Sequence, residues 1–324
     1  MEKELHELLA SGRDQRATDL LLREEEAVYV RINDRLVQGQ GVASKALMSW
    51  LFTRSIPGSS VSEGAKGLDV DQAYEWDGRC RMNLFTSQGK RCCCIRLLPQ
   101  KVRSLKELGV CEALPARIHA HRGLCLLVGK TGSGKSTTLA ALLTALTEEA
   151  PWHIITLEDP VEVVLTARQG LITQRELGRD FLSFEEGIRS ALRQSPDLLM
   201  IGEIRDPISL RAALAAAESG TGVIATMHSL GAQGTLSRML HMFSAAERDF
   251  VRFQIAATLN FLQSQILVPW NDGLKLDYEL LLGTPAVSSI IRDGQFANLK
   301  NCILLGRRLG MKPFEEQVGA SAVP

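Results

Sequence analysis

The sequence predicts an α/β protein of two domains, and two patterns carry this prediction. After residue 120, short apolar runs bounded by glycine or charge alternate with helical stretches, a pattern typical of a parallel sheet covered by helices. Before residue 100, apolar and polar residues alternate on either side of short turns, which is typical of an antiparallel sheet. The 324 residues are enough for roughly two domains of ordinary size.

The first domain is expected over residues 1–99 as a small α+β unit. The leucines of ELHELLASG have helical spacing and predict a helix that ends at Gly12. AVYVRINDRLVQ predicts a β-hairpin that turns near Asn33, and RCRMNLFTSQGKRCCCIRLLP predicts a second hairpin that turns at SQGK. We expect residues 100–112 to be a linker and residues 113–324 to form the second domain.

The second domain is expected to contain buried parallel strands separated by helices. The strands are predicted at residues 123–129, 152–159, 197–203 and 222–228. Stretches between them, such as STTLAALLTALTEEA and SFEEGIRSALRQ, have helical periodicity. Ligands of parallel sheets bind at the carboxyl ends of the strands, so the polar and glycine residues that end these runs are candidates for function.

Composition excludes several classes of protein. The net charge is zero, with 37 basic and 37 acidic residues, which argues against a broad nucleic-acid surface. No apolar run approaches the roughly 18 residues of a membrane helix, and the N-terminus lacks an apolar signal core, so we expect a soluble cytoplasmic protein. The seven cysteines form no C-x-x-C pair, and RCCCIRLL is interpreted as a strand with buried thiols rather than a metal site.

The stretch GKTGSGKST, residues 129–137, matches the phosphate-loop pattern G-x-x-x-x-G-K-[ST]. Its glycines let the backbone turn its N–H groups inward, and the helix that follows presents its positive end to phosphate. Lys135 is expected to reach the β- and γ-phosphates, and the Ser136 hydroxyl to ligate Mg²⁺. The expected nucleotide-binding residues are Gly129, Thr131, Gly132, Ser133, Gly134, Lys135, Ser136 and Thr137.

Carboxylates follow two of the predicted strands. The predicted strand at 197–203 corresponds to one that usually ends in an aspartate in P-loop ATPases. Here a glycine, Gly202, takes the place of that aspartate, and only Glu203 follows it. Glu158 and Asp159 end the strand at 152–159, and Glu162 follows it. We expect Glu203 to polarise the attacking water, and Glu158, with Glu162 nearby, to hold Mg²⁺ through water; the sequence equally allows the reverse. The alternative for Glu158 and Asp159 is a salt bridge or the cap of a helix that begins at Pro160.

His228 ends the fourth predicted strand, in IATMHS. A histidine at this place could donate a hydrogen bond to the γ-phosphate. The alternative is a structural histidine, which is the commoner role of a histidine taken alone.

These segments together resemble the secretion-ATPase superfamily, and most closely the type IV pilus retraction ATPases. The resemblance rests on ATDLLL, RCRMNLF, RSLKELG, the phosphate loop, LEDPVE, LLMIGEIRD and IATMHS. ITQRELG, residues 172–178, resembles the Q-R-E-x-G segment of retraction ATPases rather than the corresponding segment of pilus-assembly and type II secretion ATPases. One departure is Thr221, which stands where the family has the first histidine of its His box.

The resemblance implies a RecA-like P-loop ATPase domain with a parallel sheet, preceded by a smaller PAS-like N-terminal domain. It implies a homo-hexamer that hydrolyses ATP with Mg²⁺, in which Arg81 and Arg96 of the N-terminal domain reach the phosphates when the domains close. The ring would act on an inner-membrane platform protein of the pilus, at the cytoplasmic face of the membrane and without direct contact with nucleic acid. The alternatives are an assembly, secretion or competence ATPase of the same superfamily, or a regulatory ATP-binding paralogue with little turnover.

Overall fold

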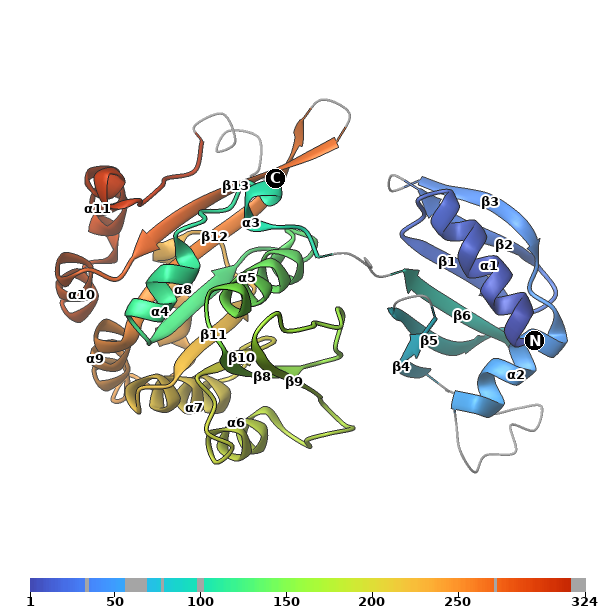
Figure 1. Ribbon diagram of the computed structural model, residues 1–324, viewed down its shortest axis with the longest axis horizontal. Coiled ribbons are helices and arrows are strands. Elements are labelled where there is room, and N and C mark those ends of the chain that lie inside the picture. The colour runs from blue at the N-terminus through green and yellow to red at the C-terminus, as the bar shows by residue number, and fades with distance from the viewer. Residues whose placement is uncertain (33–34, 56–68, 77–78, 98–101, 271–272, 316–324) are drawn as a thin grey trace. The chain divides into compact units, whose positions relative to one another are not determined.

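The computed structural model describes residues 1–32, 35–55, 69–76, 79–97, 102–270 and 273–315 (Figure 1). The chain divides into two compact units. The first comprises Met1–Lys101 together with Pro160–Val164, and the second comprises Val102–Asp159 and Leu165–Pro324.

In the described part of the first unit, six strands form one antiparallel sheet in the order β3-β2-β1-β6-β5-β4. Its elements are α1 (Glu2–Asp14), β1 (Asp19–Arg23), β2 (Ala27–Ile32), β3 (Arg35–Val42), α2 (Lys45–Ser55), β4 (Asp69–Glu75), β5 (Arg79–Ser87) and β6 (Lys90–Leu97). Both predicted hairpins are confirmed as β2–β3 and β5–β6. Gln88 and Gly89 turn the second hairpin with φ angles of 52° and 75°, whereas the residue at the first turn, Asn33, lies outside the described residues.

The predicted end of the first helix at Gly12 is wrong, because α1 continues to Asp14. Gly12 is buried, and a Cβ atom at this position would lie 2.7 Å from Cδ1 of Leu20 on β1. The glycine therefore lets the helix lie close against the sheet. On β6, Cys92 and Cys93 are buried and Cys94 is partly exposed, and burial raises the pKa of the Cys93 thiol.

Within the described residues of the second unit, seven strands form one sheet in the order β13-β12-β7-β11-β10-β8-β9. The strands are β7 (Leu124–Val128), β8 (Trp152–Glu158), β9 (Gly170–Glu176), β10 (Leu198–Ile201), β11 (Gly222–Met227), β12 (Leu259–Trp270) and β13 (Gly273–Leu282). The helices are α3 (Leu105–Leu108), α4 (Leu114–Ala120), α5 (Lys135–Glu149), α6 (Phe184–Leu192), α7 (Pro207–Glu218), α8 (Ala232–His241), α9 (Arg248–Thr258), α10 (Pro285–Arg292) and α11 (Leu299–Leu305), with 3₁₀ turns η1 (Phe296–Asn298) and η2 (Gly306–Leu309).

The four predicted strands are confirmed as β7, β8, β10 and β11, and their pairings are parallel. The expected parallel sheet needs one correction: β13 pairs with β12 in the antiparallel direction, so the sheet is mixed. The strand β9 has no fully buried residue, because it lies at the edge of the sheet. Its sequence therefore lacks the apolar run that marks the inner strands.

The chain order of the strands explains where the helices lie. From β7 the chain passes through α5 to β8, and it returns through α6 and α7 to β10 and β11. Right-handed connections therefore place α5 on one face of the sheet and α6 and α7 on the other. Because both faces are covered, every residue of β7, β10 and β11 is buried.

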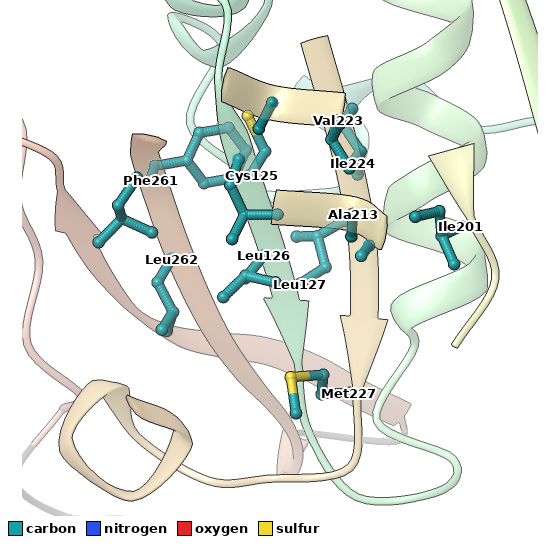
Figure 2. Packing of buried hydrophobic residues seen from close by; sticks show 14 of the residues in the cluster. Cys125, Leu126, Leu127, Ile201, Ala213, Val223, Ile224, Met227, Phe261 and Leu262 are labelled. Carbon is teal, nitrogen blue, oxygen red and sulfur yellow. The ribbon is translucent and has the colours of Figure 1, made fainter. Parts of the chain in front are cut away.

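Apolar side chains from neighbouring strands fill the core of this sheet, as Figure 2 shows for part of it. The labelled residues come from β7, β11 and β12, together with Ile201 of β10 and Ala213 of α7: Cys125, Leu126, Leu127, Val223, Ile224, Met227, Phe261 and Leu262. Among the residues that the structure describes, none of the helices combines the length and apolar content needed to cross a membrane.

The described part of the expected linker contains a short helix. Ser104 caps α3 and forms a capping box with Glu107, which satisfies main-chain donors at the start of the helix. Leu105 and Val110 are buried in the core of the second unit. Residues 102–112 therefore fold with the second unit.

Candidate functional site

The phosphate loop follows β7 and leads directly into α5. Gly132 and Gly134 have φ angles of 77° and 84°, a region that side chains with a Cβ atom rarely adopt. A Cβ atom on Gly129 would lie 2.5 Å from the carbonyl oxygen of Gln265 and 2.4 Å from Oγ of Ser133. Glycine is therefore required at Gly129 by space and at the other two positions by backbone conformation.

The lysine of the motif lies inside this loop. Lys135 is the first residue of α5, and its Nζ donates to the carbonyl oxygens of Gly129 at 2.8 Å and Lys130 at 3.0 Å. Ser136 and Thr137 follow in the first turn of the same helix. The positive end of α5 and the lysine ammonium thus face the same loop, which is the arrangement of an anion site.

A pocket of about 450 Å³ opens beside the phosphate loop. It is lined by Lys130 and Thr131 of the loop and by His228, Ser229 and Leu230, which follow β11. Because β11 is the neighbour of β7 in the sheet, its end and the phosphate loop form two walls of one pocket. The structure therefore brings the predicted histidine beside the predicted phosphate site.

Glu203 lies between a histidine and an arginine. His228 Nε2 is 3.1 Å from Glu203 Oε1, and Arg205 Nη2 is 2.7 Å from Glu203 Oε2. The Glu203 side chain is 17% exposed, so it is shielded from most solvent but not isolated from it. The pKa of Arg205 lies above its usual value because Glu203 accepts its hydrogen bonds. This chain of contacts fixes both carboxylate oxygens of Glu203.

The glycine before Glu203 has a steric explanation. A Cβ atom on Gly202 would lie 3.0 Å from the carbonyl oxygen of Leu157 and 3.3 Å from Cα of Glu158, both on the main chain at the end of β8. The Gly202 N–H also donates to Leu157 O at 2.7 Å, and the Thr226 hydroxyl donates to the Gly202 carbonyl. Any side chain at this position would therefore require the end of β8 to move by a few tenths of an ångström, which explains why glycine fits here.

Glu158 accepts hydrogen bonds from two neutral side chains. Its Oε1 accepts hydrogen bonds from the Thr156 hydroxyl at 2.6 Å and from Gln174 Nε2 at 3.0 Å. Gln174 lies on β9, and its own Oε1 accepts from the N–H of Leu165 at 2.7 Å. The glutamine of the ITQRELG segment thus orients a carboxylate on the neighbouring strand.

The cap alternative for the LEDPVE segment is wrong, because no helix begins at Pro160 in this described stretch of chain. The salt-bridge alternative fits Asp159, whose Oδ2 lies 3.9 Å from Arg205 Nη1. Glu162 belongs to the segment Pro160–Val164, which groups with the first unit, and its role stays a prediction.

The two arginines predicted to reach phosphate lie opposite one another on β5 and β6. Arg81 Nη2 donates to Asp71 Oδ2 at 2.7 Å, and Arg96 Nε donates to Asp19 Oδ1 at 3.0 Å. Each is thus bonded to a carboxylate of its own unit, and contact with a phosphate stays a prediction.

Residues 75–274 match the sequence family described as Type II/IV secretion system protein. The chain belongs to this family. It is 42% identical over 250 residues to "Uncharacterized protein YggR" of Escherichia coli strain K12, a match that covers 77% of each chain. It is 39% identical over 251 residues to the type IV pilus retraction ATPase PilT of Pseudomonas aeruginosa, covering 76% of this chain and 73% of that relative.

A solved structure of this secretion family has the same fold. The crystal structure of the pilus retraction motor PilT with bound ADP matches with a TM-score of 0.85 at 28% identity, covering 98% of this chain and 97% of that chain. The sequence relatives and this structure together identify the chain as a PilT-like member of the secretion family, as its motifs predict.

Sequence reasoning missed three residues that support the site: Gln174, Arg205 as the partner of Glu203, and Gln265 beside the phosphate loop. Gln174 lies in the segment that carries the family resemblance, which was the available signal. Gln265 lies within an apolar run, LNFLQSQILV, where a polar residue with no surface to reach signals a buried hydrogen bond.

Proposed function

We propose that the chain hydrolyses ATP to ADP and phosphate and uses this reaction to power the retraction of a type IV pilus. The observation that carries the proposal is the position of Glu203, which contacts His228 at the wall of the pocket beside the phosphate loop. The membership of the secretion family and the similarity to PilT support the same conclusion.

The phosphate loop binds the triphosphate in this proposal. Its main-chain N–H groups and the positive end of α5 face the phosphates, and Lys135 exchanges its bonds to the loop carbonyls for bonds to phosphate oxygens. Hydroxyl and carboxylate oxygens are the ligands that Mg²⁺ prefers, and Ser136, with Glu158 acting through water, supplies them. Mg²⁺ would neutralise charge that develops on the phosphates.

Glu203 is the residue that we assign to the attacking water. Its two oxygens are oriented by His228 and Arg205, which leaves its position well defined relative to the pocket. His228 can then couple binding of the γ-phosphate to the position of Glu203, because the same ring contacts Glu203 and lines the pocket. Glu158, oriented by the neutral side chains of Thr156 and Gln174, is assigned to the water ligands of Mg²⁺, with Glu162 beside it in the sequence.

The motor is proposed to be a homo-hexamer in which the antiparallel unit is a PAS-like domain. On closing of the domains, Arg81 and Arg96 would exchange their aspartate partners for phosphate, so that bound γ-phosphate favours the closed state. Release after hydrolysis would then drive the movement. The ring would work at the cytoplasmic face of the inner membrane, through a pilus platform protein and without nucleic acid.

The second candidate is an assembly or secretion ATPase of the same family, because the family description names secretion systems rather than a retraction motor. A regulatory paralogue with little turnover is less well supported. Thr221, the departure that motivates it, precedes β11 and so lies at the opposite end of that strand from His228.

Deletion of the gene in the native host separates these candidates. A retraction motor predicts cells with excess pili and no twitching, restored by the wild-type chain but not by Lys135→Ala. Loss of pili or of secretion would instead identify an assembly or secretion motor.

A further inference from the structure

The phosphate loop and the segment after β11, which form the two walls of the pocket, both bond to one strand, β12. This strand pairs with β7 on the side opposite β11, and Ser264 lies level with Val128, the last residue of β7. Gln265 therefore lies beside the start of the phosphate loop. Its side chain is fully buried, as are those of Gln263 and Ser264.

The Gln265 side chain bonds to the main chain of the phosphate loop. Its Nε2 donates to the carbonyl oxygen of Ser133 at 2.8 Å. Gln263 Nε2 donates to Gln265 Oε1 at 3.2 Å, which fixes the orientation of the Gln265 amide. The loop also packs on the strand itself, because the Gln265 carbonyl leaves no room for a Cβ atom at Gly129.

The hydrogen bond from Gln265 to the Ser133 carbonyl fixes the direction of the Gly134 N–H, a group that can bind phosphate. The carbonyl of Ser133 and the N–H of Gly134 belong to one planar trans peptide, and they point to opposite sides of it. Holding the carbonyl toward Gln265 therefore turns the Gly134 N–H away from β12. Without the bond, the peptide between these residues could rotate, because Gly134 tolerates most backbone conformations.

The second wall is attached to the same strand. The Ser264 hydroxyl accepts the N–H of Gly231 at 2.8 Å, just after the pocket-lining residue Leu230. Glu279 of β13, the pairing partner of Ser264, accepts the N–H of Ala232 at 2.7 Å. Adjacent residues of β12 thus fix both loops that line the pocket.

We propose that Gln265 is a positioning residue for nucleotide binding, and that β12 fixes the two walls of the pocket relative to one another. Gln265 does not touch the nucleotide in this proposal. It holds the peptide between Ser133 and Gly134 in the orientation that phosphate requires. The inference rests on the proposed function only in taking the ligand to be a nucleotide.

The test compares Gln265→Leu with Asn260→Leu. Asn260 is a matched control, because it is also buried on β12 and its side chain also donates to a main-chain carbonyl, that of His121, away from the pocket. Three quantities are measured for each protein: the dissociation constant of a fluorescent ADP analogue, the midpoint of thermal unfolding, and the hydrogen-exchange rate of the Gly134 amide.

Both variants should unfold at a lower temperature than the wild type, because both lose a buried hydrogen bond. Only Gln265→Leu should weaken binding of the ADP analogue, by roughly tenfold, the equivalent of one such bond. It should also speed exchange of the Gly134 amide. Gln265→Met, which keeps the length of the side chain without its donor, serves if the leucine variant does not fold.

Two results would lead to different conclusions. If the wild type binds no ADP analogue, the proposed function fails. If the wild type binds it and the Gln265 and Asn260 variants have the same affinity as each other, the positioning role of Gln265 is overturned and the proposed function stands.

Discussion

The most specific structural prediction concerns Gly202, where a single added methyl group should disturb the carboxyl ends of β8 and β10, next to Glu203. In Gly202→Ala the new carbon would lie 3.0 Å from Leu157 O and 3.3 Å from Glu158 Cα. Carbon–carbon contacts normally settle at about 3.5–4.0 Å, so the contact with Glu158 Cα is too short and the ends of β8 and β10 must separate by a few tenths of an ångström. Both obstacles are main chain, so no side chain can rotate away to relieve the contact.

The magnitude follows from two opposing effects. Overpacking of this kind costs about 1–3 kcal/mol, and the lower entropy of the unfolded alanine chain offsets about 0.4–1 kcal/mol of it. The middle of the resulting range is a net loss of about 1–2 kcal/mol, which should lower the unfolding midpoint of this unit by about 2–8 °C. Because Glu203 is the next residue, ATP turnover should fall by about three- to tenfold, since misplacement by 1 Å costs about a hundredfold.

Thermal unfolding, steady-state phosphate release and ADP binding measure these effects separately. ADP affinity should be unchanged, because Gly202 is not part of the phosphate loop. Gly234→Ala is the control: it lies within α8, its added carbon meets only Ser229 Oγ at 3.9 Å, and it should stabilise the protein by about 0.5–1 kcal/mol. A Gly202→Ala protein with wild-type stability and turnover would refute the steric explanation.

Two further substitutions test the support of the site. Gln174→Leu removes a donor to Glu158, so turnover should fall while ADP binding in the absence of Mg²⁺ stays constant; an equal loss of both would contradict the assignment. Glu279→Gln tests a partly buried carboxyl whose pKa is raised above its ordinary 4.5 by partial burial, although the Ala232 N–H and Lys300 oppose the shift. The folded state therefore holds this proton to higher pH than the unfolded chain, and wild-type stability from this group falls as pH rises from 4.5 through the folded pKa. The variant should lose that pH dependence in urea unfolding at pH 5 and pH 7 and should be no less stable than the wild type at pH 7; a constant difference between the two proteins would contradict it.

How much the sequence predicts depends on whether a feature is local. The phosphate loop and the inner strands were predictable, because the loop is a contiguous motif and strands buried on both faces are continuous apolar runs. The strand β9 was not, because an edge strand keeps polar residues, and the role of Gln174 depends on the register that places it across from Thr156. Gly12 shows the same limit. A glycine late in a helix can either end the helix or allow close packing of another element, and only the contact with Leu20 shows that Gly12 has the second role.

The carboxylates illustrate why chemistry was harder to assign than binding. Glu203 and Glu158 lie at the carboxyl ends of adjacent strands, and the sequence allows either to orient the attacking water. Their surroundings differ in the structure: Glu203 contacts His228 and Arg205, whereas Glu158 contacts Thr156 and Gln174. These partners lie up to 25 residues from the glutamates in the sequence, so no local sequence pattern predicts the contacts.

The most direct test of the central claim is steady-state ATP turnover by the purified chain and by Glu203→Gln, at several protein concentrations and with particle mass measured in parallel. The wild type should turn over ATP, with a rate per subunit that rises as a six-subunit particle forms. Glu203→Gln should bind ADP normally and lose turnover by about a hundredfold or more, the usual effect of removing a positioned general base. Undiminished turnover in Glu203→Gln, or nucleotide binding by a wild-type monomer without any turnover, would contradict the account.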